Sequence, residues 1–192
     1  MNAGTRAPGE HADVAAAFRD SMSMVASTVV LATTQVNGRP WGMTITACCS
    51  ISADPPTVLI SLASSTVSAK AIRETGCYGV NVLSSSLPAI DVARFGSAPG
   101  APKFLDECED LIVPGNGESP CVRGALAYLD CDVTDVVESG DHSLFVGLVR
   151  EVSFPADGGA LVYCYRQYQR VSPILDIVRT PESEHQLAYS AW

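Results

Sequence analysis

The residues from Gly42 to Pro56 have the types and spacing best suited to chemistry in this chain. Small hydroxyl side chains recur there at close intervals before a Pro-Pro corner, and they offer hydroxyl groups and backbone amides to a polar ligand. If the backbone is extended, alternate residues form one hydroxyl-lined face, which comprises Thr44, Thr46, Ser50 and Ser52. A solvated strand face is the alternative, although such faces more often carry Lys and Glu. The run therefore favours one wall of a site for a flat, anionic ligand.

A second polar cluster lies where a helix is expected to begin. It comprises Ser64, Ser65, Thr66 and Ser68, followed by Lys70. Backbone amides at a helix N-terminus have no intrahelical partner and bind phosphate well. An ordinary helix cap is the alternative, but a cap needs only one such side chain. The cluster therefore favours an anion site.

His142 is the histidine expected in the ordered body of the chain, because His11 and His185 lie in predicted tails. It follows Gly140-Asp141 at a turn that enters a strand. A turn histidine on its own is more often solvent-facing than functional, so its role depends on its neighbours.

Residues for metal or nucleophilic chemistry are sparse. Seven cysteines, at positions 48, 49, 77, 108, 121, 131 and 164, form no CxxC pair, and three histidines are present, so no metal site is expected. Most of these cysteines lie in apolar surroundings and are interpreted as small hydrophobic residues, while a role for the Cys48-Cys49 pair stays open. The GxSxG, GxGxxG and P-loop patterns are missing.

Length and composition indicate one domain with a substantial core. The chain has 192 residues, 47% of them apolar and 17% charged, which leaves room for a subunit interface and predicts a homo-oligomer. A formal charge of -9 gives no positive field for nucleic acid or an anionic membrane. Apolar runs stay well short of the ~20 residues that span a bilayer, and no secretion signal is apparent. We therefore expect a cytoplasmic protein with no nucleic-acid or membrane partner.

The elements that must position these residues are mainly strands. Strands are predicted at 27–34, 57–62, 78–83, 124–138, 144–152 and 161–165, helices at 13–22, 65–74 and 86–95, and a long loop over a site at 96–120. Asn37-Gly38 predicts a hairpin turn, Asp13 a helix cap and Gly76 a helix end. Leu87, Ile90 and Phe95 are expected to face inward. Six or so antiparallel strands with two interposed helices favour a closed barrel over a doubly wound sheet.

Taken in order, these residues resemble the flavin reductase family, whose members use the FMN-binding split barrel and supply reduced flavin to partner monooxygenases. The similarity extends from Phe18 to about Val171. The motifs that carry it are Gly42-Met43-Thr44, Ser50-Ile51-Ser52, Asp54-Pro55-Pro56, Val80-Asn81-Val82-Leu83, Lys103-Phe104, Gly140-Asp141-His142, Phe145-Val146-Gly147 and Tyr163-Cys164-Tyr165-Arg166 with Tyr168. The resemblance implies a mainly β domain with flanking helices over residues 12–171, a six-stranded antiparallel Greek-key split β-barrel, between a flexible arm at 1–11 and a tail at 172–192.

The resemblance also implies a function, that of an NAD(P)H:flavin oxidoreductase. Hydride would pass from nicotinamide C4 to flavin N5, and reduced FMN or FAD would diffuse to a separate flavin-dependent monooxygenase. A homodimer is expected, and NADH is favoured over NADPH because few basic residues are available to hold a 2′-phosphate.

The same resemblance implies the site residues. The flavin ring and ribityl contacts would be Met43, Thr44, Thr46, Ala47, Cys49, Ser50 and Ser52, and the phosphate contacts Ser65, Thr66 and Ser68. Asp141 and the candidate catalytic residue His142 would form the nicotinamide-side turn, and His142 would orient a ring by hydrogen bonding. Lys103, Phe104 and Tyr168 complete the set, the last two as walls.

Three other functions remain open at this stage. One is a split-barrel flavoprotein that keeps FMN tightly bound and reduces another acceptor. Another is a non-catalytic flavin- or haem-binding module. A hydrolase has little support, because GxSxG is absent.

Overall fold

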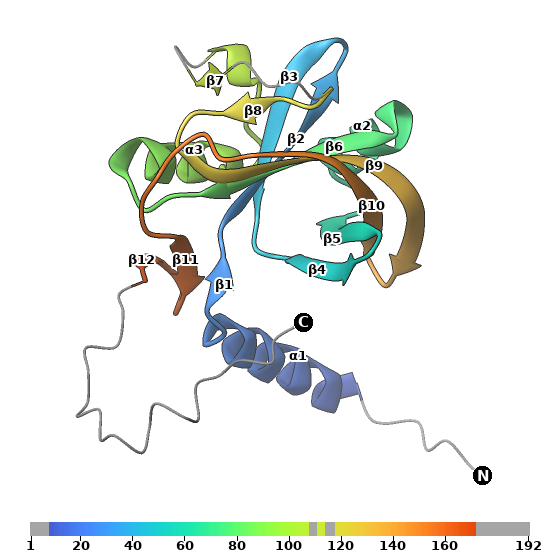
Figure 1. The fold of residues 1–192 in the computed structure, drawn as a ribbon. Coiled ribbons are helices and arrows are strands. Elements are labelled where there is room, and N and C mark those ends of the chain that lie inside the picture. The colour runs from blue at the N-terminus through green and yellow to red at the C-terminus, as the bar shows by residue number, and fades with distance from the viewer. Residues whose placement is uncertain (1–7, 108–110, 114–117, 172–192) are drawn as a thin grey trace, which may run out of the picture.

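The computed structural model describes residues 8–107, 111–113 and 118–171, and its centre is one antiparallel sheet (Figure 1). The sheet has seven strands in the order β3-β2-β6-β9-β10-β5-β4. Their bounds are β2 (Val30–Val36), β3 (Arg39–Ile45), β4 (Cys48–Ala53), β5 (Pro56–Ala63), β6 (Cys77–Leu83), β9 (Ala125–Ser139) and β10 (His142–Ser153).

The remaining elements flank this sheet. The helices are α1 (Pro8–Ser23), α2 (Val67–Thr75) and α3 (Leu87–Ser97), with a short 3-10 turn η1 (Leu105–Glu107). Two small sheets comprise β1 (Ser27–Thr28) with β11 (Leu161–Cys164) and β12 (Gln167–Arg170), and β7 (Ile112–Val113) with β8 (Cys121–Val122). The predicted mainly β class with flanking helices is confirmed. The described part of the chain contains no helix long and apolar enough to cross a membrane.

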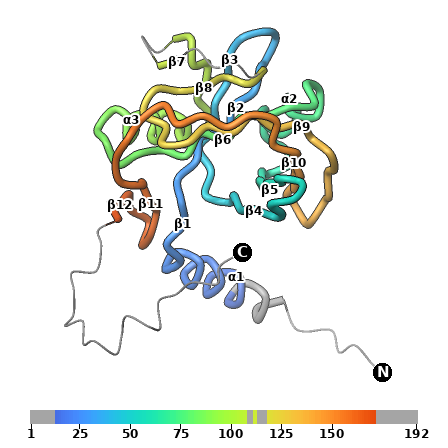
Figure 2. Tube along the Cα trace, in the orientation of Figure 1, coloured from blue at the N-terminus to red at the C-terminus, as the bar shows by residue number. Residues whose placement is uncertain are grey.

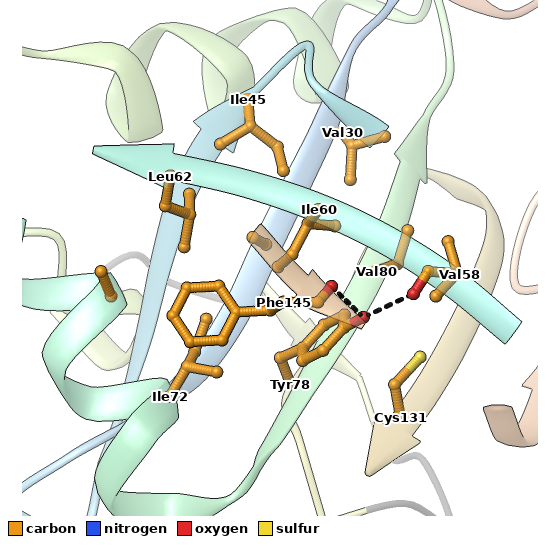
Figure 3. Close-up of a cluster of buried hydrophobic side chains, with 12 residues drawn as sticks. Val30, Ile45, Val58, Ile60, Leu62, Ile72, Tyr78, Val80, Cys131 and Phe145 are labelled. Atoms are coloured by element: carbon orange, nitrogen blue, oxygen red, sulfur yellow. Dashed lines mark hydrogen bonds between the residues drawn. The ribbon is translucent and has the colours of Figure 1, made fainter. Parts of the chain in front are cut away.

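The main sheet curls around a core of its own. One buried cluster takes side chains from β2, β3, β5, β6, β9, β10 and α2, so strands from distant places in the sheet order meet in it. Figure 3 shows this cluster, with the Tyr78 hydroxyl donating hydrogen bonds to the carbonyl oxygens of Val58 at 3.1 Å and Phe145 at 3.3 Å. A flat sheet could not bring these strands to one phenol, and the arrangement is that of a barrel interior.

Strand β2 separates this interior from a second core. Its successive side chains point to opposite faces, so Val30 and Ala32 enter the first cluster while Leu31 joins a cluster under α3. Both faces of β2 are therefore buried, and α3 is fixed against the outside of the barrel.

Local sequence signals account for the turns and helix ends. Asn37 and Gly38 have φ values of 53° and 73°, as a type I′ hairpin turn requires, and they join β2 to β3 as predicted. Helix α2 begins after Thr66, whose hydroxyl accepts a hydrogen bond from the Ala69 amide at 3.2 Å, and ends at Gly76 with φ 71°. The hairpin predicted around Gly140-Asp141 is confirmed as β9 and β10.

The hydroxyl run from Gly42 to Pro56 does not form the single extended face predicted for it. Thr44 lies on β3 and Ser50 on β4, which are the two end strands in the sheet order, and the chain bends between them at Thr46. The β4–β5 register also shifts between Ser50 and Ser52. A bend and a register shift each break the alternation of side chains, so the four hydroxyls do not line one surface.

Three smaller predictions were also wrong. Helix α1 begins at Pro8 rather than after Asp13, since proline is well suited to a first helical turn. Leu87 is 79% exposed because it opens α3 directly after the cap residue Ser86, before the helix packs on the core. The 96–120 segment, predicted as loop, contains η1 and β7.

Candidate functional site

A cavity of about 780 Å³ lies between β3, the start of α2 and the segment that follows α3. Seven of the predicted site residues line it: Met43, Thr44, Ser65, Thr66, Ser68, Lys103 and Phe104. Residues 97–104 form much of one side, so the segment predicted to cover a site borders this cavity. Three separate stretches of sequence thus meet at one cavity.

The Phe104 wall of the cavity is held by aromatic and charged contacts. Trp41 pairs with Phe104 as an isolated β-bridge, and their rings meet edge to face with centroids 5.0 Å apart. The Arg39 guanidinium lies 3.9 Å from the centre of the Phe104 ring and is itself paired with Asp106 and Glu107. These contacts fix the orientation of the Phe104 ring before any ligand binds.

Trp41 is in turn tied to the start of α2. Its indole Nε1 donates a hydrogen bond of 2.9 Å to the Ser68 Oγ, and Trp41 and Ser68 are 7% and 2% exposed. Ser68 therefore anchors the indole as well as lining the cavity. This contact joins β3 to α2 across the floor of the site.

The polar groups at the start of α2 differ in whether they already have hydrogen-bond partners within the protein. The Thr66 hydroxyl donates to the Ala63 carbonyl at 2.8 Å and accepts from Ala69, so it is committed to the helix cap. Ser65 is exposed and its hydroxyl has no hydrogen bond to the described residues. The first backbone amides of α2 also lack intrahelical acceptors. Ser65 and these amides are the groups available to a phosphate.

The Lys103 ammonium group forms hydrogen bonds within the segment after α3 and does not point into the cavity without a partner. Its Nζ donates to the carbonyl oxygens of Ala98 at 2.6 Å and Ala101 at 3.2 Å. The backbone carbonyl of Lys103 accepts a hydrogen bond from the Gly42 amide at 3.1 Å, which fastens this segment to β3.

A second cavity of about 590 Å³ adjoins the first and shares Thr44 and Ser97 with it. The predicted residues Thr46 and Tyr168 line it, together with Tyr163, Arg94, Arg166 and Gln167 among others. The hydroxyls of Thr44 and Tyr168 both donate to the Ala93 carbonyl oxygen, at 2.9 and 3.2 Å. The Thr44 hydroxyl proton is therefore used within the protein, which leaves its oxygen as an acceptor.

Asp141 and His142 lie beside the first cavity but do not line it. His142 opens β10 opposite Ala63 of β5, and the Ser64 amide donates to the Asp141 carbonyl at 2.9 Å. The turn thus adjoins the segment that leads into α2. The His142 Nδ1 is 2.7 Å from the Asp141 Oδ1, and this contact holds the pKa of the Asp141 carboxyl below its usual value. The Nε2 atom of His142 has no hydrogen-bond partner among the described residues.

The other four predicted contacts line neither cavity; they are Ala47, Cys49, Ser50 and Ser52. All four are exposed on β4 or the bend before it. Their assignment to a flavin stays a prediction. Burial raises the pKa of the neighbouring Cys48 thiol to about 11, so that residue is poorly suited to act as a thiolate.

Comparison with known proteins decides the family. Residues 22–172 match the family described as the flavin reductase like domain. The chain belongs to the flavin reductase family. It is 31% identical over 159 residues to FMN reductase (NADH) RutF 2 of Methylorubrum extorquens strain PA1, which covers 83% of this chain and 90% of that protein. It is 32% identical over 171 residues to the reductase component of 4-nitrophenol 4-monooxygenase/4-nitrocatechol 2-monooxygenase of Rhodococcus opacus, with 88% and 89% covered.

Two solved structures, one of them a flavin reductase component, have the same fold. A nitrilotriacetate monooxygenase component B from Mycobacterium thermoresistibile superposes with a TM-score of 0.77 at 27% identity, over 88% of this chain and 93% of that one. BorF, the flavin reductase component of a bacterial two-component tryptophan halogenase, gives 0.74 at 27% identity, over 82% and 98%. The mainly β fold of the flavin reductases, expected from the sequence, is thereby confirmed, although the main sheet has seven strands and not the six predicted.

Sequence reasoning missed several residues that line or support the two cavities. Trp41 received no role from the sequence, although it anchors the Phe104 wall. Arg94 and Arg166 line the second cavity and had no assigned role. Arg94 sits on the polar side of a predicted helix, which gives no functional signal. Arg166 did carry a functional signal in the sequence, because it lies between aromatic residues in a motif of the family resemblance.

Proposed function

We propose that this protein is an NADH-dependent flavin reductase that reduces FMN or FAD and supplies the reduced flavin to a separate monooxygenase. The observation that carries the proposal is the convergence of seven predicted contacts on one cavity in a chain that matches the flavin reductase like domain over residues 22–172. The relatives that are named as FMN reductases and as monooxygenase reductase components support it.

The residues around the first cavity fit a flavin. The cavity volume of about 780 Å³ lies within the range of roughly 300–1,000 Å³ typical of cofactor sites. Met43, Trp41 and Phe104 supply apolar surface for a flat ring system. Ser65 and the amides at the start of α2 supply donors for a phosphate. Flat apolar walls beside a phosphate-binding helix end are what an FMN-type ligand requires.

Hydride transfer from nicotinamide C4 to flavin N5 needs two stacked rings and the exclusion of water, and the flavin itself supplies the redox chemistry when bound. The protein's task is therefore to bind and orient. Phe104, held by Trp41 and Arg39, provides a rigid wall. His142, with Nδ1 held by Asp141, can present Nε2 to a carboxamide or ring oxygen at the cavity edge.

A homodimer is also part of the proposal, and helix α1 supports it. This 16-residue helix stands away from the barrel (Figure 2), and its described side chains are exposed apart from Ser23. Val14, Phe18 and Met22 are apolar and 49–62% exposed. An isolated helix of this length is marginal in water without a packed face, so a second copy of the chain is the proposed cover.

Anaerobic NADH oxidation tests the activity. The initial loss of absorbance at 340 nm is measured with riboflavin, FMN and FAD in turn, each against a flavin-only control. We expect the protein to raise the rate with at least one flavin. No rise above control with any of them would refute the reductase proposal. A yellow colour that survives gel filtration would instead show a tightly held flavin and refute release to a partner.

A further inference from the structure

We propose that the second cavity binds the adenosine monophosphate group that FAD and NADH share, with Arg94 and Arg166 as the cationic contacts to its phosphate. This inference rests on the proposed function, because it assumes a dinucleotide substrate in the adjoining cavity. It assigns a role to Arg94 and Arg166, which the proposed flavin and nicotinamide contacts do not include.

The position of the cavity suits the distal half of a dinucleotide. It meets the first cavity along Thr44 and Ser97, so one extended molecule can occupy both. A ligand whose reactive ring lies against Phe104 would reach the second cavity with its far end. Beyond the phosphate of the mononucleotide half, adenosine monophosphate is the far end of both FAD and NADH.

The charge at this cavity is unusual for the chain. The protein has 12 Lys and Arg against 21 Asp and Glu, yet two guanidinium groups line this cavity and no carboxylate does. Among the described residues, no arginine lines the first cavity, and its Lys103 is bonded to carbonyl oxygens. A second phosphate group would therefore find its cations here.

Neither arginine is fully occupied by its acidic neighbour. The Arg94 Nη1 is 3.6 Å from the Asp91 Oδ1, and the Arg166 Nη2 donates to the Asp20 Oδ1 at 2.5 Å. All four side chains are at least 62% exposed, so water and salt weaken both pairs. A guanidinium has five N–H donors, and one carboxylate contact leaves others for a phosphate.

The turn that carries Arg166 is strained. Tyr165 and Arg166 form the two-residue connection between β11 and β12, with φ values of 51° and 59°. Such a type I′ turn strongly favours Asn-Gly, because most other side chains disfavour a positive φ. Residues in costly conformations of this kind cluster at ligand clamps. The strain therefore points to a use for the Arg166 side chain at the cavity.

Two tyrosines give the cavity a flat, fixed side. Tyr163 and Tyr168 have ring centroids 5.3 Å apart, and the Tyr168 hydroxyl is anchored on the Ala93 carbonyl. An anchored aromatic ring beside two arginines suits a base and its phosphates, as in other nucleotide sites.

The strained turn allows a sharp test. Replacing Tyr165 by Asn together with Arg166→Gly installs the favoured turn pair, so the fold should keep or gain thermal stability while the guanidinium is lost. We expect the Kd for ADP, which contains this group, to rise about fivefold to tenfold when measured by calorimetry on the full chain, as the loss of one hydrogen bond in a partly solvated site implies. Arg94→Gln and the single variant Arg166→Gln should act in the same direction, and they carry the test if the double variant fails to fold.

Matched controls isolate the site from a general change in charge. Arg19→Gln removes one positive charge from α1, outside both cavity linings, and should leave ADP binding unchanged. Asp20→Asn removes the acidic partner of Arg166 but keeps the guanidinium, so ADP should bind equally or more tightly.

Two kinetic arms identify which dinucleotide uses the cavity. If FAD uses the second cavity, the Arg166 variants should raise the ratio of the KM for FAD to the KM for FMN by about fivefold to tenfold. If NADH uses the second cavity, the same variants should raise the ratio of the KM for NADH to the KM for dihydronicotinamide mononucleotide by that factor. The inference is overturned if ADP affinity and both KM ratios match the parent protein. Absence of NADH oxidation by the parent with every flavin would refute the proposed function instead, while the ADP titration would still decide the subsite.

Discussion

The hydrogen bond between Trp41 and Ser68 offers the most direct test of how the cavity is built. The indole Nε1 and the Ser68 Oγ are 2.9 Å apart, and both residues are almost entirely buried. Ser68→Ala removes the acceptor and leaves a buried N–H without a partner, which costs about 1–3 kcal/mol of unfolding free energy. For a chain of this size, each kcal/mol lowers Tm by about 2–4 °C.

The two partners form a double-mutant cycle. Trp41→Phe removes the donor and keeps an aromatic ring, and the double variant removes both groups at once. Because the double variant leaves no orphaned N–H, we expect it to be more stable than the sum of the two single losses by about 1 kcal/mol. Urea unfolding at fixed pH measures the free energy of unfolding of all four proteins. Equal m-values show that these free energies can be compared directly.

The same variants test whether the hydrogen bond between Trp41 and Ser68 supports the first cavity. Ser68→Ala should raise the KM for FMN, because the Trp41 ring that supports Phe104 loses its fixed position. Strictly additive stability losses would refute the coupling drawn from this hydrogen bond. Additive losses together with an unchanged KM would also remove Trp41 from the support of the cavity.

Three further changes test other parts of the structure. His142→Gln should raise the KM for NADH about twofold to tenfold, as one lost hydrogen bond implies, and an unchanged KM and kcat would remove His142 from the site. Phe18→Glu on the exposed face of α1 should convert a dimer to a monomer in analytical ultracentrifugation; a monomeric parent would contradict the proposed dimer. Arg73 holds the pKa of the Glu138 carboxyl below its usual value, so the stability from this pair is present above the ordinary carboxyl pKa and lost as pH falls through the lowered one. Glu138→Gln should flatten that acid dependence of Tm.

Local signals in the sequence were enough to predict the Asn37-Gly38 turn and the start of α2. Asn37-Gly38 and the Thr66 cap each act through two or three neighbouring residues, so their conformations follow from sequence. The cavity residues of the Ser65 to Ser68 segment followed from that helix start. The link between Trp41 and Ser68 joins distant segments and leaves no mark in either one.

Failures of the sequence reading have physical causes. An alternating run of hydroxyls has the same pattern whether one strand continues or the chain bends at Thr46, so the separation of Thr44 from Ser50 was not predictable. The Tyr165-Arg166 turn was missed because neither residue is a turn signal. A rule broken in this way is expected where function outweighs local preference.

The contact between α3 and β3 explains why the site has two compartments. At Gly96 an added Cβ would lie 2.8 Å from the Thr44 backbone nitrogen, so only glycine lets the helix approach the strand this closely. The Thr44 hydroxyl then bonds to the Ala93 carbonyl of the same helix. Thr44 and Ser97, which flank this contact, border both cavities. A displacement of α3 would therefore reshape both compartments together, and substitutions at Gly96 should impair binding in each of them.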